Sequence, residues 1–140
     1  MGRVSLRTWL IHNNIPPYRV PLFAEIAKRM DSDFRVVLTS RKCRHRPHWE
    51  RQTDTLPFSV TTMTGVNIAL SDGYSVSISF GLLPALVYAR PDIVICNGFS
   101  LSAIMVYFYA CLLRKRYVIW SEGTSVTEQR VGGLRRWLRK

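Results

Sequence analysis

The sequence predicts an α/β fold, in which a Rossmann-like parallel sheet carries helices on both faces. Short apolar, β-branched segments alternate along the chain with longer segments whose apolar residues recur at helical spacing. Two of the short segments, FRVVL at 34–38 and DIVIC at 92–96, are apolar at nearly every position, as in strands that are buried on both faces. Alternation of this kind requires right-handed crossovers, which place helices on both sides of the sheet.

The first unit consists of a strand at 8–11, a turn and a helix. Proline is tolerated in the first turn of a helix, where its missing amide hydrogen would be unpaired anyway, so Pro16 and Pro17 favour a helix start. The helix predicted at 18–30 places its large apolar residues on one face and its charged residues on the other. A second strand at 34–38 completes the unit.

The middle of the chain is less regular. Residues 40–55 are rich in arginine and predict a long loop, whereas 58–63 and 66–70 are short strand candidates. Turns are expected at Gly65 and Gly73.

The arginine-rich loop also contains Cys43, His45 and His48, which are potential zinc ligands. A structural zinc site usually has four ligands, and neighbouring arginines oppose the binding of a cation. We therefore predict no metal site.

The second half continues the alternation, with helices predicted at 82–89 and 100–113, strands at 92–96 and 117–120, and a basic helix at 134–140. The helix at 100–113 is apolar on all sides, but its apolar run would be only about 20 Å long, whereas a bilayer core needs about 30 Å. It is therefore no membrane span. It is either packed inside the protein or has one face left for a membrane surface.

The helix predicted at the carboxyl end is amphipathic. Its apolar residues Leu134, Trp137 and Leu138 share one face, and Arg135 and Arg136 lie beside them. This pattern predicts binding to an anionic membrane surface. The alternative is that the apolar face packs against other protein.

Length and composition bound these interpretations. The chain has 140 residues, 47% of them hydrophobic, which is enough for one domain with its own core. Three scattered cysteines make no disulfide framework, and no secretory leader opens the sequence, so we expect a cytoplasmic protein, peripheral at the inner face of the membrane. The net charge of +11 would attract phosphorylated ligands, anionic lipid or nucleic acid.

Ligands of parallel α/β sheets bind outside the carboxyl ends of the strands. The loops at 13–19, from 40 onward, at 97–100 and at 121–124 should therefore share one crevice. The candidate substrate-binding residues in these loops are Tyr18, Arg19, Asn97, Gly98, Ser100, Glu122, Gly123 and Thr124.

Each of these candidates has a functional and a structural interpretation. Arg19, close to a helix start, can bind phosphate through its planar fork, and Glu122 can accept hydrogen bonds from sugar hydroxyls. Alternatively, Tyr18 and Arg19 are ordinary surface residues, Ser100 is a helix N-cap, and Glu122 is a capping or solvated residue. The catalytic residues stay unknown, because the chain has no G-x-S-x-G, G-x-G-x-x-G or Walker motif.

Four segments in this order, PPYRVPLF, FRVVLTSR, RPDIVICNGFS and YVIWSEGT, together resemble the amino-terminal domain of family 4 glycosyltransferases of the GT-B fold. The similarity runs over nearly the whole chain. It implies transfer of a sugar from a nucleotide-sugar to a lipid-linked or polysaccharide acceptor, generally with retention at the anomeric carbon and without a metal. It also implies that this domain recognises the acceptor and that a carboxyl-terminal donor domain binds the nucleotide-sugar.

The chain departs from the family in one respect. The donor domain's pair of glutamates eight apart is absent, since Glu122 and Glu128 are only six apart. We therefore expect residues 1–140 to be the acceptor-side half, which binds no cofactor itself, is inactive alone and requires a donor domain in cis or in trans.

The alternative function is a non-catalytic basic α/β module that binds nucleic acid or another polyanion. Trp49 among clustered arginines suits phosphate contact and base stacking. No aromatic RNA-recognition motif accompanies it, so nucleic acid is not the expected partner.

Overall fold

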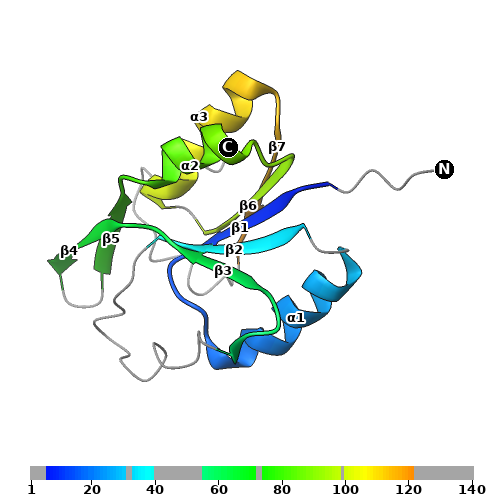
Figure 1. Ribbon diagram of the computed structural model, residues 1–140. Coiled ribbons are helices and arrows are strands. Elements are labelled where there is room, and N and C mark those ends of the chain that lie inside the picture. The colour runs from blue at the N-terminus through cyan, green and yellow to red at the C-terminus, as the bar shows by residue number, and fades with distance from the viewer. Residues whose placement is uncertain (1–5, 31–32, 40–54, 72–73, 99, 122–140) are drawn as a thin grey trace.

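The computed structural model describes residues 6–30, 33–39, 55–71, 74–98 and 100–121 (Figure 1). Its centre is a five-stranded sheet in the order β3-β2-β1-β6-β7, in which all pairs are parallel. The strands are β1 (Thr8–His12), β2 (Phe34–Leu38), β3 (Ser59–Thr62), β6 (Ile93–Asn97) and β7 (Arg116–Trp120). The predicted α/β class with a parallel sheet is confirmed, and the strand order is consistent with a Rossmann-like sheet.

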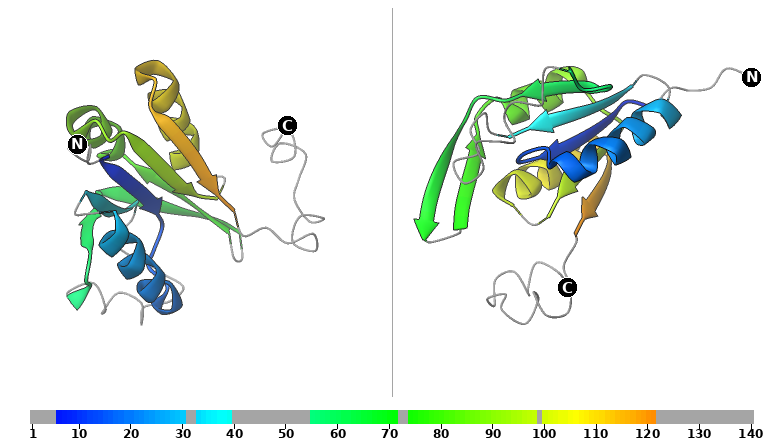
Figure 2. Two further views of the ribbon diagram at one scale, coloured as in Figure 1. Left: turned by 90° about the vertical axis from the view of Figure 1, so that its right-hand side faces the viewer. Right: turned by 90° about the horizontal axis from the view of Figure 1, so that it is seen from below.

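Helices cover both faces of the sheet, as the alternation of segments predicts (Figure 2). On one face lies α1 (Val20–Arg29), whose Phe23 is fully buried in a cluster with Leu10 and Val36. On the other face lie α2 (Leu82–Ala89) and α3 (Leu101–Leu113).

The central strand β1 explains why two separate clusters form. All five residues of TWLIH are buried, and successive side chains point to opposite faces. Leu10 joins the cluster beneath α1, whereas Trp9 and Ile11 join the cluster beneath α2 and α3. A strand buried on both faces must be apolar at consecutive positions, which is the pattern that marked it in the sequence.

The first helix begins differently from the prediction. A helix was expected from Tyr18 onward, but a 3₁₀ turn, η1 (Pro17–Arg19), precedes α1. An α-helical turn there would need an amide hydrogen on Pro21 to bond to the carbonyl of Pro17, and proline has none. The amide of Val20 bonds to that carbonyl instead, which makes the turn 3₁₀.

An antiparallel hairpin lies beside the main sheet, formed by β4 (Gly65–Ser71) and β5 (Tyr74–Ser79), and Figure 2 shows it extending away from the sheet. A strand was expected at 66–70, which agrees with β4, whereas β5 was not predicted. At Gly65 the hairpin meets the end of β2, since a Cβ atom there would lie 2.7 Å from the carbonyl oxygen of Thr39. Ser79 also donates a hydrogen bond to that oxygen through Oγ.

The long apolar helix α3 is buried on only one side. Ser102, Ala103, Val106, Tyr109 and Ala110 are buried. The opposite side is also apolar but exposed, with Phe108 at 66% and Leu112 at 83%. This side of α3 is called the outer face below.

None of the helices that the structure describes is long and apolar enough to cross a bilayer. Several predicted features lie outside the described residues. They are the arginine-rich segment with Cys43, His45 and His48, the turn at Gly73, the residues Glu122, Gly123 and Thr124, and the membrane-surface residues Leu134, Arg135, Arg136, Trp137 and Leu138.

Candidate functional site

Three parallel strands end side by side near the first turn of the chain. His12 is the last residue of β1, Asn97 of β6 and Trp120 of β7, and Asn97 is the register partner of Trp120. The turn η1 follows β1 and brings Arg19 to this edge. The loop at 13–19 therefore reaches the end of β6, where Arg19 contacts Asn97. The crevice expected between all four loops stays a prediction, because residues 40–54, 99 and 122–124 lie outside the described residues.

Arg19 is the centre of this arrangement. The side chain is buried, at 5% exposure, and Nη1 lies 2.8 Å from Nε2 of His12 and 3.5 Å from Oδ1 of Asn97. The guanidinium carbon also lies 5.1 Å from the ring centroid of Trp120. A cation is thus held against an aromatic face and two neutral polar groups at the carboxyl edge of the sheet.

Tyr18 lies next to Arg19 in the chain but is oriented differently. Its side chain is 69% exposed, and its ring centroid lies 5.8 Å from the guanidinium carbon of Arg19. The alternative that both residues are ordinary surface residues is wrong for Arg19, because three strand ends enclose it.

His12 is buried and neutral. Burial and, in second place, the positive charge of Arg19 together lower the pKa of its imidazole from 6.5 to about 4. Arginine can only donate, so Nε2 of His12 accepts from Arg19 and the ring proton is on Nδ1. The amide nitrogen of Asn14 lies 3.3 Å from Nδ1, a longer contact that the ring cannot accept at the same time.

The conformation of Gly98 and the cap formed by Ser100 determine the shape of the loop after β6. Gly98 has φ +68°, a conformation that suits glycine, and its amide donates to the carbonyl of Trp120 at 2.8 Å. Ser100 caps α3, since its Oγ accepts from the amide of Ala103 at 3.2 Å. Of the two interpretations of Ser100, the structure shows the capping role.

The end of β2 joins the same edge. The amide of Thr39 donates to the carbonyl of His12 at 3.0 Å, and its hydroxyl donates to Oδ1 of Asn13 at 3.1 Å. These bonds fix the loop that leads into η1.

His12 and Trp120 were not among the residues predicted from sequence. The available signal was their position, because both end a parallel strand, as does the predicted Asn97. A histidine at the end of an apolar strand is also typical of a buried structural residue, so the sequence alone does not separate the two roles.

The chemistry that this edge offers is binding. Arg19 supplies positive charge and hydrogen-bond donors, Asn97 an amide, and Tyr18 and Trp120 aromatic surface. Such a set suits a ligand with phosphate or hydroxyl groups and a ring. Among the described residues, no three His, Cys, Asp or Glu side chains come together to hold a metal ion.

Cys96 directly precedes Asn97 in β6, but its thiol is not activated as a nucleophile. Burial raises the pKa of its thiol to about 12, and the side chain is 1% exposed. It therefore belongs to the core beneath α3.

Comparison of the chain with models of known protein families, with curated proteins and with solved structures finds no match in any of the three. The likeness to family 4 glycosyltransferases thus rests on the four sequence segments.

Proposed function

We propose that this chain is the acceptor-binding half of a glycosyltransferase of GT-B architecture. The observation that carries the proposal is the burial of Arg19 against His12, Asn97 and Trp120 at the carboxyl edge of a parallel sheet. Ligands of such sheets bind at this edge, and a cation buried there favours an anionic ligand.

The residues at the edge suit an acceptor that joins a sugar to a phosphate. Arginine binds phosphate oxygens through its planar fork, and the exposed ring of Tyr18 can lie against the apolar face of a sugar. The four segments that resemble family 4 enzymes include PPYRVPLF, which carries Tyr18 and Arg19.

In this proposal the sugar donor is bound elsewhere. A carboxyl-terminal donor domain, supplied in cis or in trans, holds the nucleotide-sugar, and the isolated chain transfers no sugar. A lipid-linked acceptor and the net charge of +11 would keep the protein at an anionic membrane surface.

The test is binding of a prenyl-diphosphate-linked monosaccharide by the 140-residue chain, with the free monosaccharide as the comparison. Tyr18→Ala should weaken binding about fivefold or more through lost ring contact, because its side chain is exposed and its removal leaves the core intact. Arg19→Lys keeps the charge but loses the fork, and should weaken binding about tenfold.

Arg116→Lys is the matched control, since it makes the same change as Arg19→Lys but at the exposed first residue of β7, at the opposite edge of the sheet. Equal affinity of the wild type, Tyr18→Ala and Arg19→Lys for the linked monosaccharide would refute the proposed acceptor site.

A further inference from the structure

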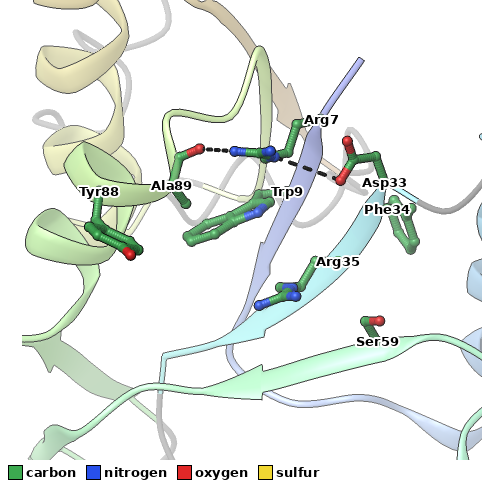
Figure 3. A pocket seen from close by; sticks show the side chains of 8 residues that line it. All are labelled: Arg7, Trp9, Asp33, Phe34, Arg35, Ser59, Tyr88 and Ala89. Atoms are coloured by element: carbon green, nitrogen blue, oxygen red, sulfur yellow. Dashed lines mark hydrogen bonds and ion pairs between the residues drawn. The ribbon is translucent and has the colours of Figure 1, made fainter. Parts of the chain in front are cut away.

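A groove lies at the opposite edge of the sheet, near the amino ends of the first three strands (Figure 3). Its volume is about 440 Å³. Trp9 of β1 is the register partner of Arg35 of β2, which in turn is the partner of Ser59 of β3. These three residues form one row across the sheet, and Tyr88 of α2 borders the groove beside them.

Arg35 is unusual for its position. β2 lies between β1 and β3, and its other four residues are buried, but Arg35 is exposed on the side of the sheet that carries α2. An interior strand of a parallel sheet is normally apolar on both faces, because helices cover both. Helix α2 covers Trp9 and leaves Arg35 open to the groove.

The guanidinium of Arg35 has more N–H donors than it uses in hydrogen bonds within the described residues. Within the part of the chain that the structure describes, it makes one hydrogen bond, from Nη1 to Oγ1 of Thr61 at 3.3 Å, and no ion pair. Arginine has five N–H donors, so most of them face the groove or solvent.

Asp33, the one carboxylate among the described residues that line the groove, does not neutralise Arg35. Asp33 pairs with Arg7 instead, with Oδ1 3.7 Å from Nε, and Arg7 also donates to the carbonyl of Ala89 (Figure 3). The groove therefore keeps a net positive charge, which favours an anion.

The walls of the groove are aromatic. Trp9 lines the groove and is 5% exposed. Tyr88 is 93% exposed, which is unusual for a large aromatic side chain next to a cavity. A flat apolar group could lie between these two rings and Arg35.

We propose that this groove binds a small aromatic anion, with its phosphate or carboxylate on Arg35 and its ring against Trp9 and Tyr88. The inference does not depend on the proposed acceptor site, because the two lie at opposite edges of the sheet. Phenyl phosphate is the probe, inorganic phosphate lacks the ring, and phenol lacks the charge.

The experiment is a titration of the ¹⁵N-labelled chain followed by the indole N–H resonance of Trp9, which Trp9→Phe assigns. Phenyl phosphate should shift this resonance and bind about tenfold more tightly than inorganic phosphate or phenol, since it uses both the charge and the rings. Binding of all three probes with equal affinity, or no shift of the Trp9 resonance, would overturn the proposal.

Variants separate the two contacts. Arg35→Gln should weaken phenyl phosphate about tenfold, whereas Arg116→Gln, the same change at an exposed strand position on β7, should have no effect. Tyr88→Ala should weaken phenyl phosphate and leave inorganic phosphate unchanged. Because Tyr88 is almost fully exposed, this variant decides the matter even if Arg35→Gln fails to fold, and unchanged affinity in Tyr88→Ala contradicts the aromatic contact.

Discussion

Lowering the pH from 8 to 5 is expected to destabilise the folded protein through His12. The ring is 3% exposed, and its pKa is lowered to about 4 by burial and by the charge of Arg19, from the ordinary value of 6.5. Below pH 6.5 the unfolded chain therefore binds a proton that the folded chain does not bind. The free energy of unfolding falls as the pH falls through this range, and the stabilising effect is fully present only above it.

The two pKa values set the size of the effect. Their full difference corresponds to about 3 kcal/mol, which is reached below pH 4. At pH 5 the loss relative to pH 8 is about 2 kcal/mol, because the unfolded histidine is mostly protonated there and the folded one is still neutral. Carboxyl groups with pKa values near 4 stay largely ionised between pH 5 and 8, so histidine dominates in this window.

The assay is urea unfolding followed by circular dichroism at several pH values between 5 and 8. His12→Gln should remove most of the slope of unfolding free energy against pH. His45→Gln and His48→Gln, measured in parallel, assign any part of the slope that belongs to the other two histidines. If His12→Gln keeps the slope of the wild type, the argument from burial and from Arg19 is wrong.

Three further predictions concern single positions. Gly65→Ala should destabilise the protein by about 2 kcal/mol or more in urea unfolding, because the new Cβ would lie 2.6 and 2.7 Å from two backbone carbonyl oxygens. Gly81→Ala is the control and should be tolerated, because the atom nearest to its new Cβ lies 3.7 Å away. Ser100→Ala should cost about 1 kcal/mol through the lost cap of α3 and leave acceptor affinity unchanged; a loss of affinity at normal stability would restore the ligand role. With a thiol reagent and peptide mapping, Cys111 should react in the native state and Cys96 only on unfolding, and rapid native labelling of Cys96 would contradict its burial.

The sequence predicted best those elements whose local pattern matches their surroundings. β2 has the predicted bounds, because consecutive apolar residues are what burial on both faces requires. β5 was missed, since YSVSIS alternates with serine and lies outside the main sheet, where it pairs only with β4. The proline-rich turn was located correctly, but its 3₁₀ form depends on Pro21, one turn further on.

The candidate site was predictable in position and not in composition. Topology places the loops after parallel strands at one edge, so Arg19 and Asn97 were named from the sequence. The burial of Arg19 was not predictable, because it depends on His12, Asn97 and Trp120, which meet only after three strands far apart in sequence align. The exposure of Arg35 was also not predicted. Its neighbours in FRVVL are apolar and indicate a strand covered on both faces, and they do not show that one face is left open at this position.

The outer face of α3 has a consequence for handling the protein in solution. Phe108 and Leu112 form an exposed apolar patch through which molecules can associate. The net charge of +11 opposes this association by electrostatic repulsion. Salt shortens the range of that repulsion to about 10 Å at 0.1 M and leaves apolar attraction intact. Concentrated samples should therefore turn cloudy as sodium chloride is added and clear again on dilution into low-salt buffer.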